Sequence, residues 1–245
     1  MKRFISILTL LGLILPSCSE ALPYSSTNAE DLILEPIAYI HNSVLSKMLS
    51  YRTKSATIED RSSYEHALFV SELACDAASE IGIEIAPNEI IDLVRTEQII
   101  FFETLGAEHF MTPILYIDKL PYEESVKLKL KELYIKDLKE GTSALENYLF
   151  QLANSSTKSY DGYSQYSYES LYNFYKSDAR IWDNYYATKG DDRARHVIAV
   201  ATDVIVGAAC SGMTGFLGAV AAGAIGALAS EVMANGEINP DSTTD

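Results

Sequence analysis

The side chains that most often carry out chemistry are few and far apart in this sequence. Its four histidines are His41, His66, His109 and His196, and none stands three to five residues from another histidine or a cysteine. A zinc site would have to be assembled wholly by the fold, and we expect no metal site. The adjacent pairs Glu65–His66 and Glu108–His109 are no ligand sets, because neighbouring residues on a helix point in different directions.

Motifs for nucleophilic or nucleotide chemistry are missing from the sequence. It contains no Gly-x-Ser-x-Gly elbow, no Walker loop and no dinucleotide fingerprint. Acidic residues are so abundant that a pair of carboxylates in the sequence is weak evidence for a catalytic site. We therefore predict that the chain is not an enzyme, has no catalytic residues and uses no cofactor.

Aromatic residues are concentrated between positions 160 and 186. Tyr160, Tyr163 and Tyr166 adjoin the turn sequence Asp161-Gly162, and we predict that these three are exposed and contact a ligand. Exposed tyrosine rings suit sugar rings or protein partners, because a rigid ring buries area at little entropic cost. The following aromatic residues lie close to helical register, and we expect them in the core: Tyr168, Tyr172, Tyr175, Trp182 and Tyr186.

The N-terminus has the organisation of an export signal. Lys2 and Arg3 precede an apolar run over residues 4–15, followed by Leu15-Pro16-Ser17-Cys18. These residues resemble the lipobox of bacterial lipoproteins, which implies cleavage before Cys18 and lipid attachment to that cysteine. Alternatives are an ordinary signal peptide and an uncleaved anchor. By the same resemblance, Ser19 after the cysteine favours the outer over the inner membrane, so we expect a lipid-anchored protein of the cell envelope.

The composition indicates a folded, acidic protein. Loss of Lys2 and Arg3 with the signal leaves seventeen basic residues against thirty-four acidic ones, a formal charge of −17. Such a surface repels phosphates, so we expect no nucleic-acid partner. Hydrophobic residues make up 48% of the chain, enough for a core. Cys75 and Cys210 lie among alanines, which favours two buried thiols over a disulfide.

Helical periodicity dominates the rest and predicts an all-α bundle of about six amphipathic helices with a C-terminal hairpin. The segment 114–117 could instead be a short extended piece. The expected helices span about 36–48, 57–82, 87–106, 121–141, 143 onward from a Ser143-x-x-Glu146 capping box, and 165–188. The predicted organisation is a signal (1–17), a tether (18–27), an acidic all-α domain (28–190), the hairpin (191–236) and a disordered acidic tail (237–245).

The segment 204–230 is uncharged and rich in small residues at four-residue spacing, which resembles the glycine zippers of membrane and pore-forming segments. It could span a membrane, although its flanking charges invert the positive-inside rule. We favour a hairpin of helices 192–209 and 215–234 packed within the body, with Asp203 at the surface rather than paired with Arg193 or Arg195. The same hairpin could insert conditionally, like that of colicins, or pair in an oligomer. The proposed strip is Gly215, Gly218, Ala219, Ala222, Gly223, Gly226, Ala227 and Ser230.

These features together predict a non-enzymatic envelope lipoprotein that binds protein or glycan. The alternative is a membrane-active, toxin-like protein whose C-terminal hairpin inserts into a bilayer.

Overall fold

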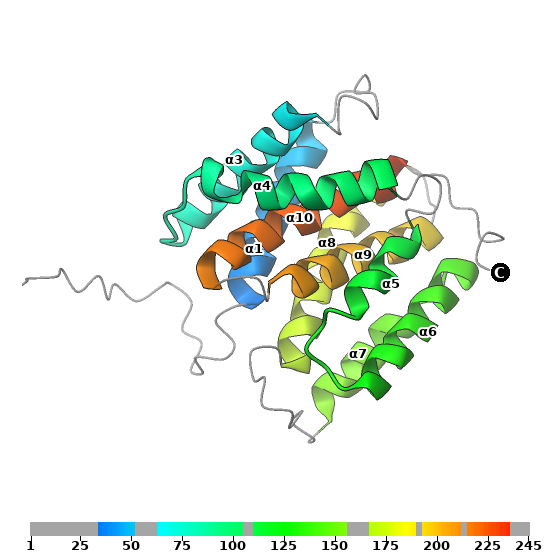
Figure 1. Ribbon diagram of the computed structural model, residues 1–245. Coiled ribbons are helices and arrows are strands. Elements are labelled where there is room, and N and C mark those ends of the chain that lie inside the picture. The colour runs from blue at the N-terminus through cyan, green and yellow to red at the C-terminus, as the bar shows by residue number, and fades with distance from the viewer. Residues whose placement is uncertain are drawn as a thin grey trace, which may run out of the picture.

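The chain is all-α, as predicted. The computed structural model describes residues 34–51, 63–104, 110–155, 167–189, 193–211 and 215–235, and these contain helices and no strand. The elements are α1 (Leu34–Tyr51), α3 (Tyr64–Glu80), α4 (Pro87–Ile99), the π-helical turn η1 (Ile100–Thr104), α5 (Thr112–Ile117), α6 (Glu124–Glu140), α7 (Ala144–Asn154), α8 (Tyr168–Lys189), α9 (Arg193–Cys210) and α10 (Gly215–Asn235) (Figure 1).

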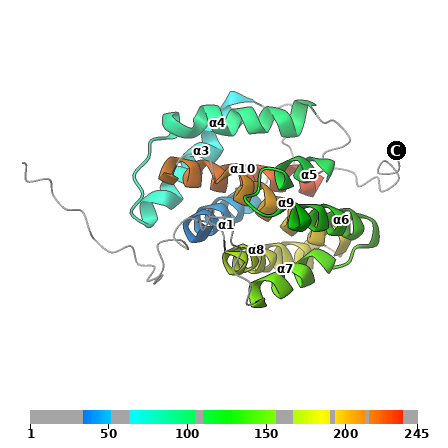
Figure 2. The same cartoon turned by 60° about the horizontal axis from the view of Figure 1, so that its bottom comes forward.

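The C-terminal helix α10 lies in the middle of the bundle. It packs against α9 and α1, and against α3 and α4 on another side. The helix α9 in turn contacts α5, α6 and α8, and α7 covers α6 and α8. Figure 2 shows the resulting layers, with α3 and α4 at the top, α1, α10 and α9 in the middle, and α7 and α8 at the bottom.

The hairpin that we predicted from small residues is formed by α9 and α10, and its helix bounds are confirmed to within a residue. From Phe216 to Ala229 the side chains of α10 are apolar on all faces, which is typical of a helix surrounded by protein. Val220, Ala224 and Leu228 are fully buried. The described helices include none that is both long and apolar enough to cross a membrane.

Local backbone chemistry explains where several helices begin and end. Pro87 occupies the first turn of α4, and the Glu89 carboxylate accepts a hydrogen bond from the backbone N–H of Ala86 at 2.8 Å. Proline suits this position because its missing N–H would be unpaired there anyway. Gly141 ends α6 with a φ of 62°, a left-handed conformation that glycine adopts without a steric cost.

One open alternative is excluded and one local prediction was wrong. The segment 114–117 is helical, within α5, because Pro113 stands in a first helical turn. The helix α7 begins after Ser143 as expected, but this side chain makes no capping hydrogen bond. The carboxylate of Asp137 on α6 accepts from the backbone N–H groups of Ala144 and Leu145 instead, each at 2.9 Å.

Cys75 and Cys210 do not form a disulfide. Cys75 on α3 and Cys210 at the end of α9 are both buried free thiols. This agrees with the favoured expectation, in which each cysteine fills a small apolar site in the core.

Candidate functional site

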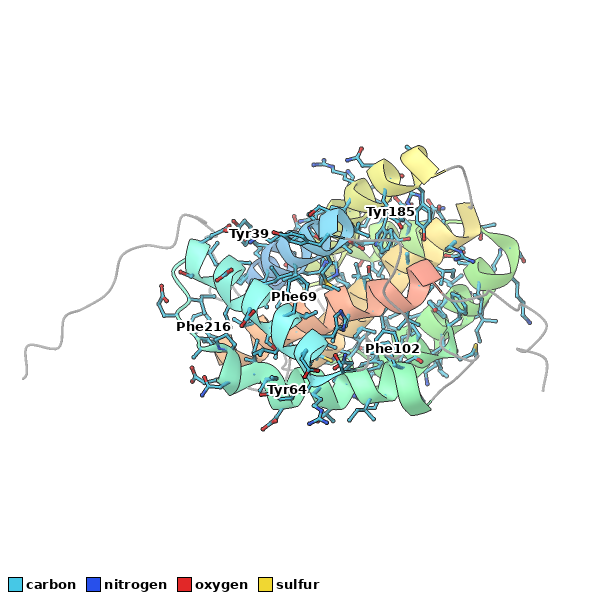
Figure 3. The ribbon with its side chains drawn as sticks, turned by 90° about the horizontal axis from the view of Figure 1, so that it is seen from above. Tyr39, Tyr64, Phe69, Phe102, Tyr185 and Phe216 are labelled. Carbon is cyan, nitrogen blue, oxygen red and sulfur yellow. The ribbon has the colours of Figure 1, made fainter. Side chains whose placement is uncertain are left out.

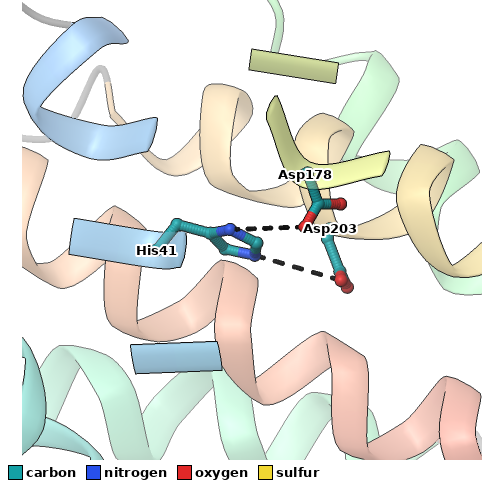
Figure 4. Close-up of side chains that lie close together, drawn as sticks. All are labelled: His41, Asp178 and Asp203. Atoms are coloured by element: carbon teal, nitrogen blue, oxygen red, sulfur yellow. Dashed lines mark ion pairs between the residues drawn. The ribbon is translucent and has the colours of Figure 1, made fainter. Parts of the chain in front are cut away.

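Three ionisable side chains meet at the centre of the bundle. His41 on α1, Asp178 on α8 and Asp203 on α9 each have no solvent exposure. His41 Nδ1 lies 3.8 Å from Asp178 Oδ1, and His41 Nε2 lies 3.9 Å from Asp203 Oδ2 (Figure 4). One nitrogen or oxygen atom can be chosen from each residue so that all three lie within 4.8 Å of one another.

The position of Asp203 corrects the sequence-based expectation. We expected this carboxylate at the surface, but it is fully buried because α9 is enclosed by α1, α5, α6, α8 and α10. Its Oδ2 accepts a hydrogen bond from the indole Nε1–H of Trp182 at 2.8 Å. Trp182 is itself fully buried, as its helical register predicted.

A weak signal for this cluster was present in the sequence. Asp178 stands three residues after Tyr175 and four before Trp182, so it shares the apolar face of α8. His41 likewise lies four residues after Ile37 and three before Val44, on the buried face of α1. A polar residue in the register of a core face is either paired inside the protein or functional.

A chain of hydrogen bonds orients the imidazole of His41. Asn42 Nδ2 donates to Ser177 Oγ at 3.0 Å, and the hydroxyl of Ser177 donates to the carbonyl of Phe174 at 2.9 Å. The amide oxygen of Asn42 is therefore the atom that faces His41 Nδ1, at 3.0 Å. Because that oxygen can only accept, we assign the proton to Nδ1, which leaves the lone pair of the imidazole on Nε2.

Burial shifts the protonation of the cluster toward neutral forms. Desolvation lowers the pKa of His41 to about 4, and the contacts with Asn42 and with the backbone of Gly226 offset only part of this effect. The pKa of Asp178 is raised well above its usual range, first by burial and then by the neighbouring Asp203. Within the described residues, neither oxygen of Asp178 has a hydrogen-bond partner.

The glycines of α10 make room for this cluster. A Cβ on Gly226 would lie 2.8 Å from His41 Cδ2 and 3.2 Å from the carbonyl oxygen of Asp203. A Cβ on Gly223 would lie 2.6 Å from Ile40 Cγ2 and 3.1 Å from the backbone nitrogen of His41. Both distances below 3 Å are too short for a real contact, so α1 and its imidazole approach α10 only because these positions are glycine.

The remaining residues of the predicted small-residue strip lie partly in the core and partly at the start of α10. Gly215 begins α10, is exposed and has a φ of 54°. Ser230 lies in α10, and its side chain is outside the described part. The other members, all buried, are Gly218, Ala219, Ala222 and Ala227. The three predicted ligand-contact residues Tyr160, Tyr163 and Tyr166, and the lipid attachment residue Cys18, also lie outside the described residues.

A surface pocket of about 500 Å³ lies between α1 and α8, next to the buried cluster. Asn42, Phe174 and Ser177 line this pocket and also contact or support His41 from the outside. The ring of Phe174 meets the imidazole edge to face, with centroids 5.2 Å apart. The other lining residues are Glu35, Ala38, Tyr39, Ser43, Ser46, Ser170 and Asn173.

The other described histidines lie at separate places. His66 Nδ1 is 3.1 Å from the amide nitrogen of Gln98. His196 Nε2 is 3.3 Å from Asp183 Oδ1 in a more exposed pair, and its ring stacks on Tyr186. His109 lies outside the described residues.

Comparisons with protein-family models, with curated proteins and with solved structures find no match to this chain. A functional assignment must therefore start from the chemistry of the pocket and the cluster themselves.

Proposed function

We propose that this chain is a non-enzymatic lipoprotein of the bacterial cell envelope that binds a neutral, hydroxyl-rich ligand, a glycan, in the pocket between α1 and α8. The observation that carries the proposal is the chemistry of the pocket lining. Hydroxyl and amide groups surround a space of about 500 Å³, which suits a small sugar.

The polar groups of the lining can both donate and accept hydrogen bonds. Serine hydroxyls and asparagine amides have this double capacity, and the hydroxyl groups of a sugar require it. The groups in question are Ser43, Ser46, Ser170 and Asn173, since the amide of Asn42 and the hydroxyl of Ser177 already bond to each other. Among the described residues of the lining, Glu35 is the one carboxylate and none is basic, which favours a neutral ligand over an anionic one.

Two aromatic side chains add apolar surface to the same pocket. Tyr39 and Phe174 line it, and Figure 3 shows Tyr39 on α1 at the periphery of the bundle. The hydroxyl of Tyr39 donates to Glu80 Oε2 at 2.7 Å, which holds this side chain against α3. An aromatic ring fixed in this way offers a rigid surface to the C–H face of a sugar.

The proposed anchor would keep this pocket close to a membrane. Leu34, the first residue of α1, follows the predicted lipidated Cys18 by about sixteen residues. A chain of that length spans at most about 55 Å even when fully extended. The pocket lies on α1, so a lipid on Cys18 would restrict the protein to ligands at or near the envelope surface.

The direct test is calorimetric titration of the mature chain carrying Cys18→Ser. The probes are maltotriose, cellotriose and triacetylchitotriose. We expect at least one to bind with one site per chain, and the double variant Ser46→Ala, Asn173→Ala to weaken binding at least tenfold. Ser50→Ala is the matched control, because this hydroxyl lies on the same helix but bonds to the carbonyl of Lys47. Failure of all three probes to bind at millimolar concentration would overturn the glycan assignment.

We propose that the α9–α10 hairpin serves this binder as packing core, which is supported by the burial of α10 among α1, α3, α4 and α9. Dye release from lipid vesicles tests this role. The Cys18→Ser chain should cause none at neutral or acid pH. Release at either pH would favour the membrane-active alternative, since the apolar hairpin is the segment suited to insertion.

A further inference from the structure

The His41–Asp178–Asp203 cluster places buried nitrogen and oxygen atoms opposite one another at distances beyond hydrogen bonding. Among the described residues, His41 Nε2 and both carboxylate oxygens of Asp178 have no hydrogen-bond partner. The separations of 3.8 and 3.9 Å between the imidazole and the two carboxylates are too long for hydrogen bonds. Buried acceptors of this kind cost free energy unless a donor or a cation satisfies them.

The hydrogen bonds around the cluster are of the kind that orients metal ligands in proteins. The Nδ1–H of His41 is held by Asn42 Oδ1 at 3.0 Å, which fixes the ring and directs the Nε2 lone pair inward. The indole N–H of Trp182 fixes one oxygen of Asp203 at 2.8 Å. Metal-binding histidines and carboxylates are commonly oriented by such second contacts.

We propose that His41, Asp178 and Asp203 bind one divalent transition-metal ion of the zinc type at the centre of the bundle. A divalent cation and two carboxylates have no net charge together, which allows the complex to be buried. The ion would also supply a partner to His41 Nε2 on α1 and to the carboxylate of Asp178 on α8, and Asp203 on α9 would complete the ligand set. This proposal is independent of the glycan proposal.

The ligand set selects among metals. One imidazole and two carboxylates suit zinc and its first-row neighbours. Calcium requires six to eight oxygen ligands and magnesium keeps several waters, and both requirements conflict with a fully buried site. Tetrahedral bonds of 2.0–2.1 Å place ligand atoms about 3.4 Å apart. The proposed ligand atom Nε2 lies 3.9 Å from Asp203 Oδ2, and donor atoms chosen one from each residue lie within 4.8 Å of one another, so binding requires these atoms to move inward by roughly 0.5–1.4 Å.

The role of such an ion would be to join distant parts of the chain. It would link α1 to α8 and α9, and the ring of His41 also lies against α10 at Gly226. Since Asn42 and Ser177 line the α1–α8 pocket, the ion would stabilise the wall of that pocket from behind. Metal that binds only the folded state stabilises that state by mass action.

The test uses the mature Cys18→Ser chain, stripped with EDTA and dialysed, and titrated with Co²⁺ and then Zn²⁺. Trp182 is the single tryptophan of the chain, and its bond to Asp203 makes it a direct reporter. We expect Co²⁺ to quench its fluorescence with an end point at one equivalent, Zn²⁺ to displace the cobalt, and Zn²⁺ to raise Tm by several degrees. A chain that binds neither ion at one equivalent would overturn the proposal.

Asp178→Asn is the decisive variant. It keeps the side-chain shape but removes one ligand charge, so metal affinity should fall at least 100-fold. The metal-free variant should melt at or above the wild-type temperature, because it replaces a buried carboxyl group without hydrogen-bond partners by a neutral amide of the same shape. The matched control His196→Gln, Asp183→Asn removes the more exposed histidine–aspartate pair and should leave binding unchanged.

Metal affinities of the two variants can also contradict the proposed site. Equal metal affinity in Asp178→Asn and the parent, or loss of binding in the His196 control, would place the metal elsewhere on the chain. Should Asp178→Asn fail to fold, as seen by circular dichroism, the one-equivalent end point at Trp182 still decides the matter. Quenching without saturation at one equivalent would indicate adventitious binding only and would overturn the proposal.

Discussion

The close approach of α10 to α1 predicts that adding a methyl group at Gly223 or Gly226 destabilises the protein. In an unconstrained helix interior, a change from glycine to alanine stabilises by about 0.5–1 kcal/mol. Here the new Cβ of Gly223→Ala would lie 2.6 Å from Ile40 Cγ2 and 2.9 Å from Ile40 Cβ. These atoms belong to the base of a branched side chain and can move only together with α1.

The magnitude follows from two opposing terms. Inserting a methyl group into a packed core costs about 1–3 kcal/mol, and the gain in helix propensity returns up to about 1 kcal/mol. We expect a net loss of about 1–2 kcal/mol for Gly223→Ala. For Gly226→Ala we expect a similar loss, because its Cβ would lie 2.8 Å from the ring of the fully buried His41.

Gly207→Ala on α9 is the control, because the added methyl group would meet a looser contact there. Its Cβ would meet the outer ring atoms of Phe174 at 3.2 Å, a contact that a small movement of the ring can relieve. We expect its stability to lie within about 0.5 kcal/mol of the parent, because the packing and propensity terms nearly cancel.

Urea unfolding followed by circular dichroism measures these differences. The midpoint should fall for Gly223→Ala and Gly226→Ala at an unchanged m-value, which reports lost stability without a change in the surface exposed on unfolding. Wild-type or higher stability in either variant would refute the close packing of α10 on α1. In a double-mutant cycle, Ile40→Ala should partly rescue Gly223→Ala, since it removes the nearest atom.

Two further predictions concern buried carboxylates. Asp137→Ala should destabilise the protein by about 2–3 kcal/mol in urea unfolding, because the N–H groups of Ala144 and Leu145 lose their acceptor. Asp137→Asn should cost less, because its amide oxygen still accepts. In the metal-free protein, the raised pKa of Asp178 and the lowered pKa of His41 should offset each other between about pH 4 and 6.5. Above pH 6.5 the unfolded chain has released both protons, so stability should fall with pH, by up to about 1.4 kcal/mol per pH unit, until the folded chain also loses the proton of Asp178. Asp178→Asn should abolish this slope; a parent whose unfolding free energy depends on pH no more than that of Asp178→Asn would contradict the assignment.

The sequence alone determined the class of fold and most helix bounds. Proline at a helix start, glycine at a helix end and apolar residues at helical spacing act within one or two turns of the chain, so they can be read without the partner helices. Gly141 and Pro87 illustrate this, since each acts on its own backbone. The four-residue spacing of small residues also indicated that α10 would lie close to another backbone.

Only the tertiary structure decided which side chain accepts hydrogen bonds at the start of α7 and which polar side chains meet in the core. Asp137 replaced Ser143 as the acceptor at the start of α7, and the indole of Trp182 became the partner of Asp203 in the core. The candidate site depends on residues from α1, α8 and α9, and no local spacing links them. Contacts between helices depend on how whole faces pack, so the same periodicity that placed His41, Asp178 and Asp203 on buried faces could not show that these faces meet.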